Sequence, residues 1–130
     1  MTRTLYRILY RMLCVQVGSC DAYVQIEVDD VDTMHDEREG LRTSVVTSLN
    51  PEWRERHEID GFKYKEGCTI TLTLYDSDPD PMDSDDLIGK VEVPVPPLGG
   101  WSKEQGYPVM TEGGLAQTKA KLFVSLRWRA

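Results

Sequence analysis

The sequence predicts an all-β protein with the architecture of an antiparallel sandwich, and two observations lead to this prediction. Short runs of alternating apolar and polar residues recur along the chain, which is the pattern of strands with one buried face. Turn-forming residues such as Asn50-Pro51, Glu66-Gly67 and Gly113-Gly114 separate the runs at intervals typical of β-sandwiches. The chain of 130 residues, 40% of them apolar, is long enough to bury a core, so we expect one domain over residues 1–130.

Residues 4–17 fit two patterns, since their apolar side chains follow either a helical stripe or one face of a strand. A basic amphipathic helix here would indicate an element that lies on a membrane surface. We favour a strand, because the rest of the chain reads as all-β and a sandwich needs a first strand at this place. Three further strands are predicted at residues 22–28, 41–47 and 53–60, and the last is expected at a sheet edge because it is less apolar.

The clearest alternation lies in the second half of the chain. Residues 69–75 alternate threonine with apolar side chains, and residues 90–95 and 122–128 alternate in a similar way. One face of each strand is therefore expected to be buried. The residues predicted to face the core are Ile70, Leu72, Leu74, Val91, Val93, Val95, Leu122, Val124, Leu126 and Trp128.

Charge is segregated along the chain, whose formal net charge is −7. Residues 76–86 hold six aspartates and a charge of −6, residues 27–39 carry another −6, and the rest of the chain carries +5. The net charge argues against a nucleic-acid partner, whereas the mildly basic remainder suits contact with an anionic membrane. We interpret residues 29–39 as a surface loop, with a partner contact as the alternative.

The cysteines and the N-terminal run favour a cytoplasmic protein. Cys14, Cys20 and Cys68 match no metal motif in their spacing, and reduced thiols are the expected state. The apolar run near the N-terminus is interrupted by Arg7 and Arg11, which argues against a secretory signal. No stretch approaches the length of a transmembrane span.

The aspartate run directly follows the strand predicted at residues 69–75. Carboxylates at this density repel one another unless a cation or open solvent relieves them, so the run is either a metal site or a solvated acidic tip. Calcium takes about six to eight oxygen ligands and suits such a run. An EF-hand loop that starts at Asp76 is excluded, because its sixth and twelfth positions need glycine and glutamate but are Pro81 and Leu87.

Four segments, taken in order, resemble signature motifs of the C2 domain family. They are Cys20-Asp21-Ala22-Tyr23-Val24, Arg42-Thr43-Ser44-Val45, Leu49-Asn50-Pro51-Glu52-Trp53 and residues 72–78, the last closing with Asp85-Asp86-Leu87-Ile88-Gly89. The resemblance implies an eight-stranded antiparallel Greek-key β-sandwich, in the topology whose last strand, residues 121–128, completes the fold. It also implies three loops at one end of the sandwich, which hold Ca²⁺ and contact phospholipid.

The resemblance also implies which residues of this chain would bind calcium. The implied ligands are Asp21, Asp76, Asp78 and Asp86, with Asp80, Asp83 and Asp85 as auxiliary carboxylates. Asp85 competes with Asp86 for the late position of the third loop. The first loop is short and lacks a counterpart of the family's earlier aspartate, so we expect a single calcium site rather than two or three.

Two kinds of side chain are candidates for membrane contact. Met82 in the third loop and Val17 in the first are the apolar candidates. Arg54 and Arg56 share a strand face by period-two spacing, in the region where related domains bind phosphoinositide head groups. Neighbouring glutamates dilute this basic patch, so a solvated face is the favoured interpretation.

The sequence favours a binding module over an enzyme. His35 and His57 are the only histidines, and no nucleophile motif, phosphate-binding loop or zinc spacing accompanies them. The leading hypothesis is calcium-dependent, peripheral association with anionic phospholipid membrane. The alternative is a calcium-independent C2-like module that binds a protein partner, which the short first loop favours.

Overall fold

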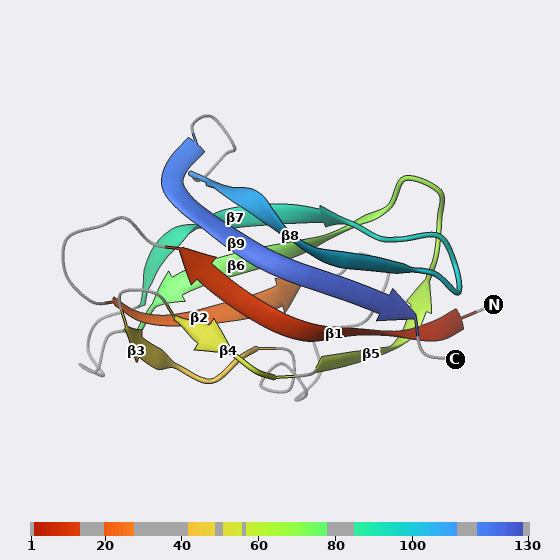
Figure 1. Ribbon diagram of the computed structural model, residues 1–130, viewed down its shortest axis with the longest axis horizontal. Coiled ribbons are helices and arrows are strands. Elements are labelled where there is room, and N and C mark those ends of the chain that lie inside the picture. The colour runs from red at the N-terminus through yellow and green to blue at the C-terminus, as the bar shows by residue number, and fades with distance from the viewer. Residues whose placement is uncertain are drawn as a thin grey trace.

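The structure is a computed structural model that describes residues 2–13, 20–27, 42–48, 51–55, 57–77, 85–111 and 117–128. The strands of this part of the chain are β1 (Thr2–Leu13), β2 (Cys20–Glu27), β3 (Val46–Ser48), β4 (Glu52–Trp53), β5 (His57–Lys63), β6 (Thr69–Asp76), β7 (Asp86–Pro94), β8 (Trp101–Met110) and β9 (Gln117–Trp128) (Figure 1). The predicted all-β class is confirmed. Within these residues, no helix is long and apolar enough to cross a membrane.

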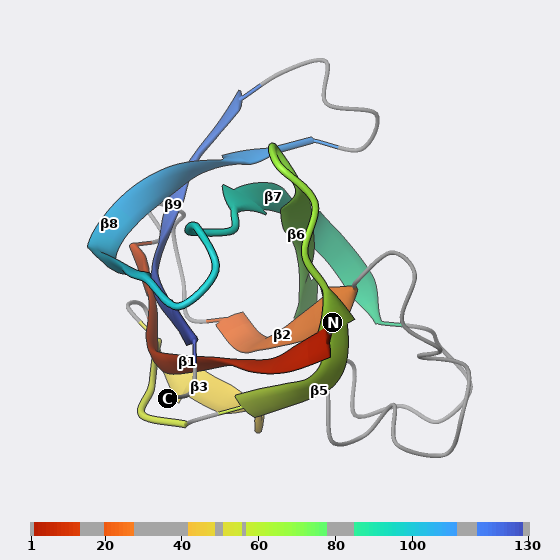
Figure 2. The same cartoon turned by 90° about the vertical axis from the view of Figure 1, so that its right-hand side faces the viewer.

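The strands pair antiparallel in the order β3-β2-β6-β7-β8-β9-β1-β4, with β5 also beside β1. Viewed along the strands, the sheet curls round a central core (Figure 2). A single described pair, Lys90 with Met110, joins β7 to β8, so the sheet divides there into two halves. β4 and β5 pair with successive parts of β1 and act as one interrupted strand. Each half then has four strands, in agreement with the predicted eight-stranded sandwich.

Several of the strand pairs join distant parts of the chain. β2 pairs with β6, and β1 pairs with β9. Long connections that return the chain to pair with an earlier strand are characteristic of Greek-key folds. The last strand, β9, lies between β8 and β1 and completes the second half, which is the topology implied by the family resemblance.

The alternation predicted for the second half of the chain is confirmed. All ten residues predicted to face the core are buried, and the most accessible of them, Val95, is only 8% exposed. Trp53, Ile59 and Phe62 join the same core from β4 and β5. Removal of this apolar surface from water is the main force that holds the two halves together.

The first half of the chain departs from the predicted boundaries. The segment that fitted two patterns is a strand as far as Leu13, and residues 14–17 lie outside the described residues. The strand predicted at 41–47 is shorter, since Arg42 forms one isolated bridge with Gln25 and β3 begins only at Val46. The strand predicted at 53–60 is interrupted between Trp53 and His57.

The strand β8 was not predicted from the sequence. Its residues include Gly106 and Pro108, show no regular alternation, and are mostly exposed. Backbone pairing with β9 holds it in place, from Trp101 opposite Arg127 to Met110 opposite Gln117. Backbone hydrogen bonds do not depend on the side chains, so hydrophobic periodicity carries little sign of such a strand.

Gly89, from the Leu-Ile-Gly motif, lies where β7 and β8 approach closely. A Cβ atom at this position would be 2.5 Å from the carbonyl oxygen of Met110 and 2.5 Å from Cγ1 of Val109. The carbonyl belongs to the backbone and cannot turn aside. Only glycine therefore fits here without moving β8, next to the single described pair that joins the two halves.

Candidate functional site

Aspartates gather where β2 begins, β6 ends and β7 begins, and we call this region, with Asp21, Asp76, Asp85 and Asp86, the acidic end. The backbone N–H of Asp21 donates to Oδ1 of Asp76 at 3.0 Å. The N–H of Ser77 donates to the carbonyl oxygen of Asp21 at 2.7 Å. Asp76 lies opposite Asp86 in the register of β6 and β7. The fold thus brings the backbones of Asp21, Asp76 and Asp86, three of the four principal ligands that the resemblance implied, to the same end of the sheet.

The carboxylates of the acidic end have few partners. The Thr47 hydroxyl donates to Oδ1 of Asp21. Among the described residues, no lysine, arginine or histidine forms an ion pair with Asp21, Asp76 or Asp86. Asp21, Asp76 and Asp86 therefore carry negative charge without a cationic partner from this part of the chain. A bound cation would lower the electrostatic energy of such a cluster.

Asp85 is held differently from Asp86. The Tyr23 hydroxyl donates to Oδ2 of Asp85 at 2.5 Å. The Tyr23 ring stacks on Tyr75 with centroids 5.4 Å apart, and the Arg42 guanidinium lies 5.1 Å from the Tyr23 centroid. Burial, the bond to Asp85 and the negative charge of Asp85 raise the pKa of Tyr23 to about 12, so its hydroxyl remains a donor at neutral pH. Asp86 is exposed.

Several of the predicted site residues lie outside the described residues. This applies to Asp78, Asp80, Asp83, Met82, Val17 and Arg56, and to the acidic loop at residues 29–39. Within the described ranges, no group of three or more His, Cys, Asp and Glu side chains could hold a metal ion. Carboxylate oxygens suit calcium, so the donor chemistry of the acidic end fits the ion. The described carboxylates alone do not complete a coordination shell.

Arg54, the described member of the predicted basic patch, extends into solvent. Its side chain is 85% exposed, and Nη2 lies 3.8 Å from Oε2 of Glu52. Arg54 lies between β4 and β5, outside any strand. The period-two rule that was used to place Arg54 and Arg56 on one face therefore does not apply at Arg54.

A second polar cluster connects the edges of the two halves, and we call its residues, Thr43, Ser44, Trp53, Glu55 and His57, the Ser44 clasp. The Trp53 indole N–H donates to the carbonyl oxygen of Ser44 at 2.8 Å. The Glu55 carboxylate accepts the Ser44 N–H at 3.1 Å and the Ser44 hydroxyl at 2.5 Å. Some of these residues belong to the motifs that resemble the C2 family, but the motifs did not predict these hydrogen bonds.

Thr43 connects the clasp to β2. Its Oγ1 accepts the N–H of Val24 at 2.9 Å, and its own N–H donates to the carbonyl oxygen of Val24 at 2.9 Å. The Thr43 hydroxyl in turn donates to the carbonyl oxygen of Ser44 at 2.9 Å. Thr43 is only 3% exposed, so its hydroxyl oxygen, and not water, is the hydrogen-bond acceptor for the Val24 N–H.

His57 has a structural place in the clasp. Its Nε2 lies 3.1 Å from the carbonyl oxygen of Arg42 and 3.5 Å from Oε1 of Glu55. A carbonyl oxygen can only accept, so Nε2 is the donor to Arg42. The spacing of Glu55 and His57 predicted that they could lie together, and they do. His57 Nε2 and the Glu55 carboxylate are therefore both engaged in polar contacts.

Comparisons with known proteins agree with this architecture. The C2 domain family model matches residues 9–109. A solved C2 domain is 21% identical, with a TM-score of 0.68, over 98% of this chain and 99% of that one. A C2 domain of a plant extended synaptotagmin 1 is 16% identical, with a TM-score of 0.71, over 98% and 94%. Human GIVD cytosolic phospholipase A2 is 18% identical, with a TM-score of 0.67, over 98% of this chain but 16% of that one.

These likenesses to solved structures show a shared fold. The match to the phospholipase covers a small part of that enzyme and concerns only this β-sandwich. A comparison with curated proteins found no match.

Proposed function

This chain belongs to the C2 domain family, and we propose that it is a calcium-dependent module that binds anionic phospholipid membrane as a peripheral cytoplasmic protein, with residues 1–130 as a single domain. A C2 domain is a membrane-, lipid- or calcium-binding module in many members, and alone it is non-catalytic. The observation that carries the proposal is the bond from the Asp21 N–H to Asp76 Oδ1, which draws the ends of two loops together.

The proposed ligands fall into two groups. Asp21, Asp76, Asp78 and Asp86 would supply the principal carboxylates, with Asp80, Asp83 and Asp85 as auxiliary ligands. Asp86 is favoured over Asp85 because the Tyr23 hydroxyl already occupies Oδ2 of Asp85. Asp21 and Asp76 each use Oδ1 in an internal hydrogen bond, so their Oδ2 atoms are the proposed ligating oxygens.

Charge compensation is the proposed basis of membrane docking. Without a cation, the acidic end repels an anionic surface. Bound Ca²⁺ would supply the positive charge that compensates these carboxylates. Met82 and Val17 are the proposed apolar contacts with the membrane. Arg54 and Arg56 are proposed as a second, electrostatic contact, which salt would weaken.

Calcium titration tests the proposal. We expect calorimetric heat and a higher melting temperature when calcium is added, because an ion that binds only the folded state stabilises it. We also expect calcium-dependent pelleting with phosphatidylserine vesicles, abolished by Asp76→Asn with Asp78→Asn. A matched control, Glu66→Gln with Glu92→Gln, removes equal charge at exposed sites on other strands and loops and should pellet as the wild type. Absence of heat and of stabilisation at millimolar calcium would refute the proposal.

The second candidate function is a calcium-independent module that binds a protein partner. It is favoured by the lack, within the described residues, of three ligating side chains that could hold one ion. Pelleting or partner binding that persists in a calcium chelator would support this alternative.

A further inference from the structure

Trp101, the first residue of β8, is unusually accessible for a large apolar side chain. It is 69% exposed, compared with 47% for Val45, the next most exposed large apolar residue of the described chain. Single exposed apolar residues are common on protein surfaces, so exposure by itself does not identify a site. The surroundings of Trp101 supply the further observations.

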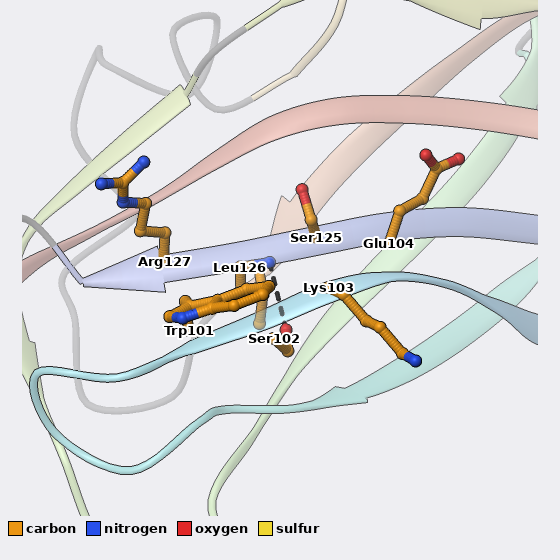
Figure 3. A pocket seen from close by; sticks show the side chains of 7 residues that line it. All are labelled: Trp101, Ser102, Lys103, Glu104, Ser125, Leu126 and Arg127. Carbon is orange, nitrogen blue, oxygen red and sulfur yellow. Dashed lines mark hydrogen bonds between the residues drawn. The ribbon is translucent and has the colours of Figure 1, made fainter.

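Trp101 lines a recess of about 430 Å³ on the outer surface of β8 and β9, which we call the Trp101 pocket. The other lining residues are Ser102, Lys103, Glu104, Ser125, Leu126 and Arg127 (Figure 3). This volume is in the range of small-ligand and side-chain pockets, about 300–1,000 Å³.

An irregularity in the pairing of β8 with β9 shapes the pocket. Ser102 pairs with Leu126 and Gln105 pairs with Val124, so β8 has one more residue than β9 between these pairs, as at a β-bulge. The N–H of Leu126 donates to Oγ of Ser102 at 3.2 Å, so a side chain supplies its acceptor. In Figure 3 the side chains of Lys103 and Glu104 diverge from this point. Bulges commonly redirect side chains in this way beside binding sites.

Two cationic side chains, Arg127 and Lys103, line the pocket together with the indole. Trp101 and Arg127 are directly opposite each other on neighbouring strands, and Lys103 is two residues further along β8. Among the described residues, neither Arg127 nor Lys103 forms an ion pair. Glu104 is the one carboxylate among the described residues that line the pocket, and it already has a partner. The pocket is thus a cationic and aromatic site on a protein whose net charge is −7.

We propose that the Trp101 pocket binds a segment of a partner protein that places an apolar side chain against the indole and an adjacent aspartate or glutamate near Arg127 and Lys103. Tryptophan and arginine are the residues that most often dominate binding energy at protein interfaces. A carboxylate complements the two cations and accepts hydrogen bonds from the guanidinium fork of Arg127.

The place of the pocket favours a protein over a membrane as its occupant. Trp101 begins β8, whereas Met110 at the other end pairs with Lys90, four residues along β7 from Asp86 at the acidic end. At about 3.3 Å per residue, the ten residues of β8 separate the pocket from that end by about 30 Å. A membrane that meets the acidic end would therefore leave the Trp101 pocket accessible. The pocket would be the binding site of the second candidate function, the calcium-independent module that binds a protein partner. The proposal for the pocket does not depend on whether the acidic end binds calcium.

Selection from a displayed library of random peptides tests the proposal, with a calcium chelator present throughout so that failure of the calcium site has no effect. We expect the enriched peptides to carry an aromatic or aliphatic residue next to aspartate or glutamate. Measured by fluorescence anisotropy, these peptides should bind Trp101→Ala and Arg127→Glu at least about tenfold more weakly than the wild type. The control variant Lys90→Glu makes the same charge change on the exposed surface of β7 and should bind within about twofold of the wild type.

The proposal is overturned if no peptide is enriched, if the enriched peptides lack acidic residues, or if both pocket variants keep full affinity. Vesicles of phosphatidylserine and phosphatidylcholine are tested in parallel. Chelator-resistant pelleting that Trp101→Ala abolishes would assign the pocket to the membrane and also overturn the proposal. Trp101 and Arg127 are exposed, so neither variant should unfold the protein; an unchanged melting temperature checks this.

Discussion

The acidic end and the Ser44 clasp both derive from motifs that resemble the C2 family, yet their polar groups are in opposite situations. In the clasp, the Ser44 N–H, hydroxyl and carbonyl all have partners within the protein. At the acidic end, Asp21, Asp76 and Asp86 lie at the same end of neighbouring strands, and no cation of the described chain pairs with them. A cluster with satisfied groups stabilises the fold, whereas a cluster with uncompensated charge costs stability and is suited to bind an ion.

The contrast predicts that changes in the clasp alter stability and that changes at the acidic end alter the response to calcium. Four experiments test this separation, from the largest expected effect to the smallest.

Trp53→Ala should have the largest effect, because Trp53 is 1% exposed and also donates to Ser44. We expect a loss of about 3–5 kcal/mol in the free energy of unfolding, measured with urea. Trp101→Ala removes the same side chain from a site that is 69% exposed and should cost less than about 0.5 kcal/mol. Similar losses for the two variants would contradict a structural clasp.

Asp76→Asn should act mainly through calcium. The amide keeps an oxygen that can accept the Asp21 N–H, so stability without calcium should stay the same or rise as repulsion is relieved. Calcium at a hundred times its dissociation constant should stabilise the wild type by about 2.7 kcal/mol, and the variant should lose most of this. Equal calcium-induced shifts in melting temperature for both proteins would remove Asp76 from the proposed ligands.

Thr43→Val keeps the shape of the side chain but leaves the buried Val24 N–H without its acceptor. We expect a loss of about 2 kcal/mol in the free energy of unfolding and no change in calcium response. Thr69→Val, at an exposed position of β6, is the matched control and should change stability by less than about 0.5 kcal/mol. An altered calcium response in Thr43→Val would show that the two regions are coupled.

Tyr23→Phe should have the smallest effect, about 1 kcal/mol at neutral pH, since it removes the hydrogen bond to the partly accessible Asp85. The pKa of Tyr23 is about 12 in the folded protein and 10.0 as its ordinary value. Its contribution to stability is therefore complete below pH 10 and is lost as pH rises towards 12, because the unfolded state releases its proton first. Alkaline unfolding should be less steep in Tyr23→Phe than in Tyr75→Phe, and equal slopes would contradict this assignment.

Some features of the fold followed from local pattern. Alternation predicted that β6, β7 and β9 each bury one face, because side chains in a strand point alternately to its two sides. Two other parts of the chain do not follow this pattern. β8 lacks alternation and is held in place by backbone pairing with β9. The strand predicted at 53–60 is interrupted near Glu55, whose carboxylate accepts a hydrogen bond from the Ser44 N–H.

By itself the sequence determined the fold class, the family resemblance and the density of aspartates after β6, since each of these depends on residue type and spacing alone. Only the tertiary structure decided that Asp21 meets Asp76 across 55 residues, that Tyr23 holds Asp85, and that Ser44 is fastened by Trp53 and Glu55. It also decided that Trp101 stands beside Arg127 at the pocket. These contacts depend on which strands become neighbours and in what register. Alternation along the sequence indicates that a segment is a strand, but it does not indicate which distant strand pairs with it.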